Sequence, residues 1–125
     1  MKLHQLFLSE EDLILSSPMN EMANLFPDET GLQRIIWFGE VGGQHGPRIK
    51  VSNIKGKFSQ SDNFVISVDK NPKVLTPKSM KIKTNELEDL FDWVKLNYDD
   101  LMKMWKMYET GTGSPNQILM SLKKI

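Results

Sequence analysis

Residues 86–108 read E-L-E-D-L-F-D-W-V-K-L-N-Y-D-D-L-M-K-M-W-K-M-Y, and their hydrophobic pattern decides the fold. At about 100° per residue, the apolar side chains fall within roughly half of a helix circumference and the charged ones fill the rest. The spacing predicts an amphipathic helix from Glu86 to Tyr108. Asn97 followed by Asp100 could also begin a second helix, so a single helix and a pair broken near Asn97 both stay open. Gly111 or Gly113 is expected to end it.

The residues before this helix show the alternation of β-strands. Residues 33–40 are rich in branched and aromatic side chains, which predicts a strand buried on both faces. Residues 47–54, 64–69 and 79–83 alternate apolar with polar side chains, which predicts strands with one face toward solvent. The chain is therefore expected to be α+β, with a small antiparallel sheet of three to five strands against a C-terminal helix or helix pair.

The two ends of the chain are harder to interpret. Residues 3–15 could form two edge strands, and a short helix is expected from Met19 to Phe26, stopping before Pro27. After Ser114 the pattern allows either a short final helix or a strand. These segments are expected to belong to one domain, residues 1–125.

Composition excludes several classes of protein. The chain of 125 residues has no cysteine, which rules out disulfides, thiolate metal sites and Cys nucleophiles. The first residues lack the pattern of a signal peptide, and no apolar run approaches the roughly 18 residues of a membrane helix. A cytoplasmic location without a membrane partner is therefore expected.

Charge is unevenly distributed although the net charge is zero. Residues 48–83 carry nine Lys or Arg against Asp62 and Asp69, and acidic segments lie on both sides. If the polar faces of two predicted strands point the same way, Arg48, Lys50, Lys81 and Lys83 form one basic sheet face. Such a face could contact phosphates or an acidic partner, or it could simply keep the sheet soluble. No exposed aromatic accompanies it, which favours a protein partner over nucleic acid.

The apolar arc of the helix is wider than a single sheet requires. A stripe of little more than about 100° is enough to cover a sheet. The excess is a flank that holds Trp93, Met102 and Met104. Either the first thirty residues cover this flank or a partner does, and methionine-rich surfaces adapt well to partners.

The sequence carries no catalytic or metal-binding motif. His45 lies in a glycine-rich loop, residues 42–46, but no second ligand sits at a suitable spacing, so neither a metal nor a cofactor is expected. A hydrolase centred on His45 stays open because triads assemble in space. The glycines at 42–46 and 111–114 lack the phosphate-loop pattern and suit turns.

The segment from Ile35 to about Glu109 resembles a family of small bacterial proteins catalogued as domain of unknown function 4160. The resemblance rests on Phe38-Gly39, on residues 47–51 (P-R-I-K-V), 56–58 (G-K-F) and 65–69 (V-I-S-V-D), and on the helical series Leu90, Trp93, Asn97, Leu101 and Trp105. It implies a small sheet with helices, an origin in bacteria or mobile genetic elements, and no established activity.

Three positions depart from that family. Arg48, Lys50 and Asn97 stand where the family carries histidines, so any chemistry of those histidines would be lost here. Residues 1–30 form an N-terminal extension outside the resemblance, and so does the tail.

Three functions are weighed on these grounds. The first is a non-enzymatic cytoplasmic protein that binds another protein, or a second copy of itself, through the helix flank or the sheet edge. The second is a nucleic-acid-binding module that uses the basic sheet face. The third is the hydrolase centred on His45.

Overall fold

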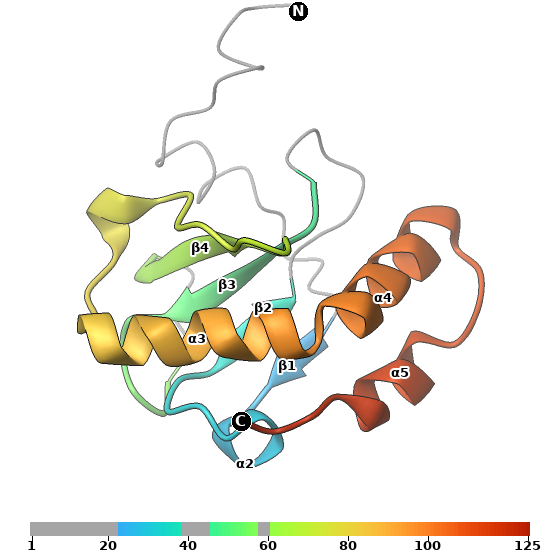
Figure 1. Cartoon of the computed structure of the whole chain (residues 1–125), viewed down its shortest axis with the longest axis horizontal. Helices are drawn as coiled ribbons and strands as arrows, with labels where there is room; N and C mark the ends of the chain where they lie inside the picture. The colour runs from blue at the N-terminus through green and yellow to red at the C-terminus, as the bar shows by residue number, and fades with distance from the viewer. Residues whose placement is uncertain (1–22, 39–45, 58–60) are drawn as a thin grey trace, which may run out of the picture.

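A computed structural model describes residues 23–38, 46–57 and 61–125 of the chain. Four strands form one antiparallel sheet in chain order: β1 (Ala23–Leu25), β2 (Ile36–Phe38), β3 (Arg48–Ser52) and β4 (Asn63–Ser67) (Figure 1). Ile36 lies opposite Val51, and Ile49 lies opposite Ile66. The predicted α+β class, with a small antiparallel sheet and C-terminal helices, is confirmed.

The amphipathic stretch at residues 86–108 forms two helices in the structure. The helices α3 (Thr84–Leu96) and α4 (Tyr98–Thr110) meet at Asn97, so the alternative of a broken pair is confirmed. Gly111 ends α4 in the left-handed conformation with φ 69°, which costs a glycine little. A last helix, α5 (Pro115–Ser121), follows, so the helical alternative for the tail holds.

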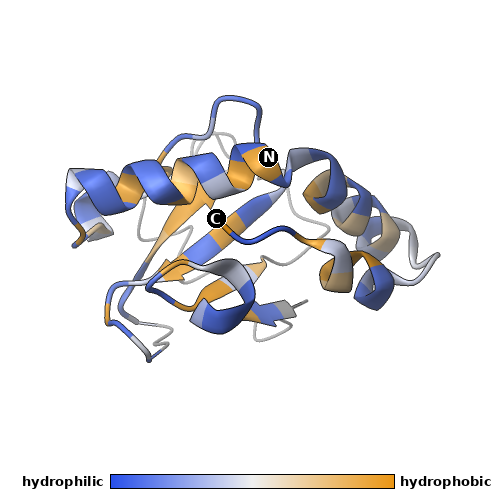
Figure 2. Ribbon diagram, turned by 60° about the horizontal axis from the view of Figure 1, so that its bottom comes forward, coloured by the Kyte–Doolittle hydropathy of each residue, from blue (hydrophilic) through white to orange (hydrophobic). Residues whose placement is uncertain are grey.

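The core lies between one face of the sheet and the helices. Apolar side chains of the strands meet those of α3 and α4, and Trp93, Leu101 and Met104 are fully buried. In Figure 2 the hydrophilic turns of α3 lie on its outer side, and hydrophobic stretches lie on the strands beneath it. The apolar arc predicted from the sequence is thus the surface that covers the sheet.

The opposite face of the sheet is buried as well, which contradicts one expectation. Every residue of β3 is buried, and in β4 only Ser67 is partly exposed. Trp37, Lys50 and Val65 lie in one row across three strands, and the Lys50 ammonium sits 5.8 Å from the centre of the Trp37 ring. The prediction of a solvent-facing side on these strands is wrong, because alternation reports which face a residue occupies and not whether that face is covered.

Two predicted elements are replaced by others. Residues 23–25 form the edge strand β1 and not the end of a helix, and Pro27 begins the short helix α2 (Pro27–Thr30). Residues 79–83 form no strand, because Pro77 begins the 3-10 helix η2 (Pro77–Ser79). The edge of β4 pairs instead with residues 73–76, where Leu75 N donates to Val65 O at 2.7 Å and Val65 N to Thr76 Oγ1 at 2.7 Å.

The predicted strands at 3–15 and residues 19–22 of the predicted first helix lie outside the described ranges. Within those ranges, no helix combines the length and the apolar character needed to cross a membrane.

Candidate functional site: a lysine-lined groove beside a buried ion pair

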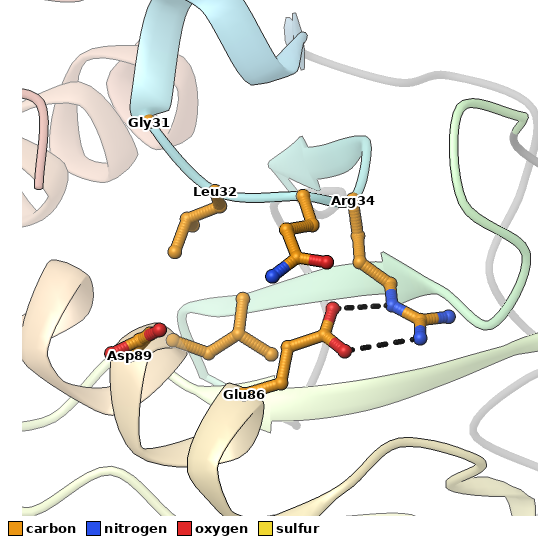
Figure 3. Close-up of a pocket in the computed structure, with 7 residues that line it drawn as sticks. Gly31, Leu32, Arg34, Glu86 and Asp89 are labelled. Carbon is orange, nitrogen blue, oxygen red and sulfur yellow. Dashed lines mark hydrogen bonds and ion pairs between the residues drawn. The ribbon is translucent and has the colours of Figure 1, made fainter.

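A buried ion pair joins the sheet layer to the helix layer at the start of α3. Arg34, in the segment between α2 and β2, donates from Nε to Glu86 Oε2 at 2.6 Å and from Nη2 to Glu86 Oε1 at 3.1 Å (Figure 3). The two side chains are only 8% and 11% exposed. Glu86 lies in the first turn of α3, where a carboxylate also interacts favourably with the helix dipole. Arg34 Nη1 donates to the carbonyl of Asn53, so the guanidinium contacts both α3 and the segment that follows β3.

Asn53, just after β3, organises the segment that leads into α3. Its side-chain Nδ2 donates to Ser79 O at 2.7 Å and to Asp62 Oδ1 at 3.1 Å, and its Oδ1 accepts from Lys81 N at 2.9 Å. The amide therefore satisfies backbone groups of a segment that has no strand ladder of its own. This arrangement fixes the path of residues 79–81 against the end of β3.

An open groove of about 530 Å³ lies beside the ion pair. Three exposed lysines line it: Lys55 from the turn after β3, and Lys81 and Lys83 from the segment before α3. The remaining lining residues are polar or aliphatic: Gln33, Arg34, Ile82, Asn85 and Glu86. A smaller cavity of about 40 Å³ lies near the same ion pair, between the Gly31–Arg34 segment and α3 (Figure 3). Three described lysines thus converge on one hollow surface.

One of the three lysines already has an acidic neighbour. Lys81 Nζ lies 3.0 Å from Asp62 Oδ1. The hydrogen bond from Lys81, followed by that from Asn53, holds the pKa of the Asp62 carboxyl below its ordinary value of 3.8. Among the described residues, neither Lys55 nor Lys83 has an acidic partner. The groove thus keeps an excess of positive charge.

The structure divides the four residues of the predicted basic face. Lys81 and Lys83 come together in the groove, although not on a strand. Arg48 and Lys50 do not line it, and they are buried at 2% and 5% exposure. Arg48 Nη1 donates to Gly46 O at 3.3 Å, and Lys50 stacks on Trp37. The prediction that these two form an exposed binding surface is wrong, because their long aliphatic stems allow burial on the covered face.

The predicted helix flank is corrected in the same way. Trp93 and Met104 are fully buried in the core, so they offer no surface to a partner. Both side chains belong to the hydrophobic core cluster that the helices form with the strands. Met102 alone stays partly exposed, in a shallow groove with Tyr98, Asp99, Lys103 and Lys106.

Two candidate features remain, the loop histidine His45 and a metal site. His45 lies outside the described residues. In the described part of the chain, no group of three or more His, Asp or Glu side chains is arranged to hold a metal ion.

Sequence reasoning missed Arg34, Asn53, Asp62 and Lys55, which hold or line the groove. Ser52 ends β3 and Asn53 follows it, and both residue types are common at turns. Only the folded structure shows that Asn53 holds residues 79–81. Comparison of the chain with family models, curated proteins and solved structures finds no match.

Proposed function

We propose that the chain is a non-enzymatic cytoplasmic binding protein that acts by protein–protein contact, and that the lysine groove is its contact surface. The observation that carries the proposal is the convergence of Lys55, Lys81 and Lys83 on one hollow, with one neutralising carboxylate, Asp62. Cations held beside an open surface steer and bind acidic partners. The resemblance to domain of unknown function 4160 extends the proposal to an origin in bacteria or mobile elements.

The chemistry of the groove favours an acidic protein surface over nucleic acid. None of the residues that line it is aromatic, so bases would find no side chain on which to stack. Glu86 also lies at its floor, although its charge is paired with Arg34. The exposed acids of α3, Glu88, Asp89 and Asp92, show that a second copy of the chain carries a surface of the required sign. Self-association is therefore one form that the contact could take.

The test uses charge reversal with a matched control. Lys55→Glu/Lys83→Glu changes two groove lysines, and Lys95→Glu/Lys103→Glu makes the same charge change on exposed helix positions outside the groove. Binding of a labelled poly-glutamate peptide is measured by fluorescence anisotropy at about 20 mM and about 300 mM salt. We expect the groove variant alone to lose most of the binding at low salt.

Two results would count against the proposal. Equal loss in both double variants would show that net charge, and not the groove, binds the peptide. Tighter binding of a single-stranded oligonucleotide, lost in the groove variant, would favour the nucleic-acid module instead.

A further inference from the structure

The side-chain amide of Asn97 holds the C-terminal segment by hydrogen bonds to its backbone. Asn97, at the break between α3 and α4, is 2% exposed. Its Nδ2 donates to Lys123 O at 3.0 Å, and its Oδ1 accepts from Lys123 N at 2.7 Å. The same Nδ2 also donates to Trp93 O at 3.0 Å. A side-chain amide that pairs with both groups of one residue imitates a strand neighbour, so it recognises an extended backbone and not a particular side chain.

A second anchor lies two residues further along. Ile125 N donates to Thr30 O at 2.9 Å, at the end of α2. Gly31 follows with φ +80°, and a Cβ placed there would come within 2.5 Å of Ile125 O. The glycine therefore allows the close approach of two backbones. Asn97, Thr30 and Gly31 together form a seat for an extended segment, and Figure 1 shows the C-terminus beside α2.

The segment that fills this seat is joined to the rest of the chain by a short glycine loop. We define the clasp as residues 115–125, that is, α5 and the four residues after it. No residue of α5 is buried, and Met120 is 87% exposed. Gly111 and Gly113, in the loop before the clasp, both have positive φ. Ile118, Leu119 and Leu122 of the clasp pack against the core but stay partly exposed. Opening the clasp therefore costs less free energy than opening the fully buried elements of the core.

We infer that the clasp is exchangeable, so that the clasp of one copy occupies the seat of a second copy. Every hydrogen bond between clasp and seat is kept in a reciprocal exchange, because the seat consists of α2 and the α3–α4 break, which belong to the body of the domain. An empty seat leaves the Asn97 amide without its two hydrogen bonds to the backbone of Lys123. An identical clasp from a neighbouring chain satisfies it, and such exchange is a low-cost route to dimers.

A substitution in the loop before the clasp should shift the equilibrium between the closed and the exchanged clasp. A Cβ on Gly113 would lie 2.9 Å from the Met107 side chain, in a conformation that alanine rarely adopts. Gly113→Ala therefore strains the closed loop, and an opened loop relieves that strain. Gly56→Ala is the matched control, since Gly56 has a φ of +72° and no atom within 4 Å of such a Cβ.

Disulfide trapping tests the inference in a chain that has no cysteine of its own. Ser121 Oγ of the clasp lies 3.5 Å from Asp100 Oδ2 of α4, so Asp100→Cys/Ser121→Cys places two thiols across the contact. The oxidised protein is separated on a non-reducing gel after incubation at increasing concentration. A closed clasp gives a cross-linked monomer, and an exchanged clasp gives a covalent dimer.

We expect the covalent dimer to increase with protein concentration, and to increase several-fold when Gly113→Ala is added but not when Gly56→Ala is added. The single variant Ser121→Cys gives the background of random cross-linking. Cross-linked monomer alone, at every concentration and in both glycine backgrounds, would overturn the inference. A dimer formed through the lysine groove would leave the disulfide intramolecular, so failure here is distinct from failure of the proposed function.

Discussion

Two buried asparagines have similar structural roles, one before the start of α3 and one at its end. Asn53 holds the segment that enters α3, and Asn97 holds the segment that follows α5. Each uses one side-chain amide to satisfy both a backbone donor and a backbone acceptor, which a strand would otherwise supply. At the residue scale, irregular segments are therefore positioned by single amides and not by ladders.

Asp62 is expected to make the stability of the fold depend on pH in the acidic range. Its pKa in the folded protein lies below the ordinary value of 3.8, chiefly because Lys81 donates to it. A lowered carboxyl pKa stabilises the fold at pH above the unfolded value, and that contribution is lost as the pH falls through the lowered pKa. Asp62→Asn should therefore weaken the protein near neutral pH and flatten its stability profile below about pH 4.

The measurement is urea unfolding at several pH values. Asp92→Asn, on the exposed face of α3, is the control. If Asp62→Asn changes stability equally at neutral and strongly acidic pH, the ion pair with Lys81 does not act on the folding equilibrium.

At the scale of elements, the two tryptophans of the helix pair differ in burial. Trp93 of α3 is fully buried, whereas Trp105 of α4 packs against the core and stays partly exposed. Trp93→Ala should cost about 3–5 kcal/mol, the usual range for a buried tryptophan. Trp105→Ala should also destabilise the protein, but by less, because it removes less buried area. Thermal melts followed by circular dichroism compare the two, and an equal or larger loss for Trp105 would contradict the assigned burial.

At the scale of the whole molecule, the Arg34–Glu86 pair ties the two layers across 52 positions of sequence. Arg34→Met leaves a largely buried carboxylate and the Asn53 carbonyl without their partner, which typically costs about 3–5 kcal/mol. The double variant Arg34→Met/Glu86→Leu should cost clearly less, since no buried charge is left alone.

Urea unfolding followed by tryptophan fluorescence measures both changes. Lys95→Met, at an exposed helix position, should stay within about 0.5 kcal/mol of the parent. A double variant as unstable as Arg34→Met would show that the pair acts through packing and not through charge.

The sequence by itself determined the elements whose side chains carry a periodic signal. The apolar arc of residues 86–108 and the alternation of residues 47–54 and 64–69 predicted a small antiparallel sheet covered by a helix or a helix pair, and the structure has the pair. These features are local, because the period of hydrophobic residues follows from the geometry of one helix or one strand.

Only the tertiary structure decided which charges reach solvent and which segments are held without periodicity. Arg48 and Lys50 alternate like solvent-facing residues, yet the face they occupy is covered. The groove of Lys55, Lys81 and Lys83 depends on Asn53 and on the Arg34–Glu86 pair, whose partners lie far apart in the chain. The spacing of hydrophobic residues identifies which residues share one face of a helix or strand. Whether that face is buried, and which distant residues it contacts, depends on how the assembled layers pack together.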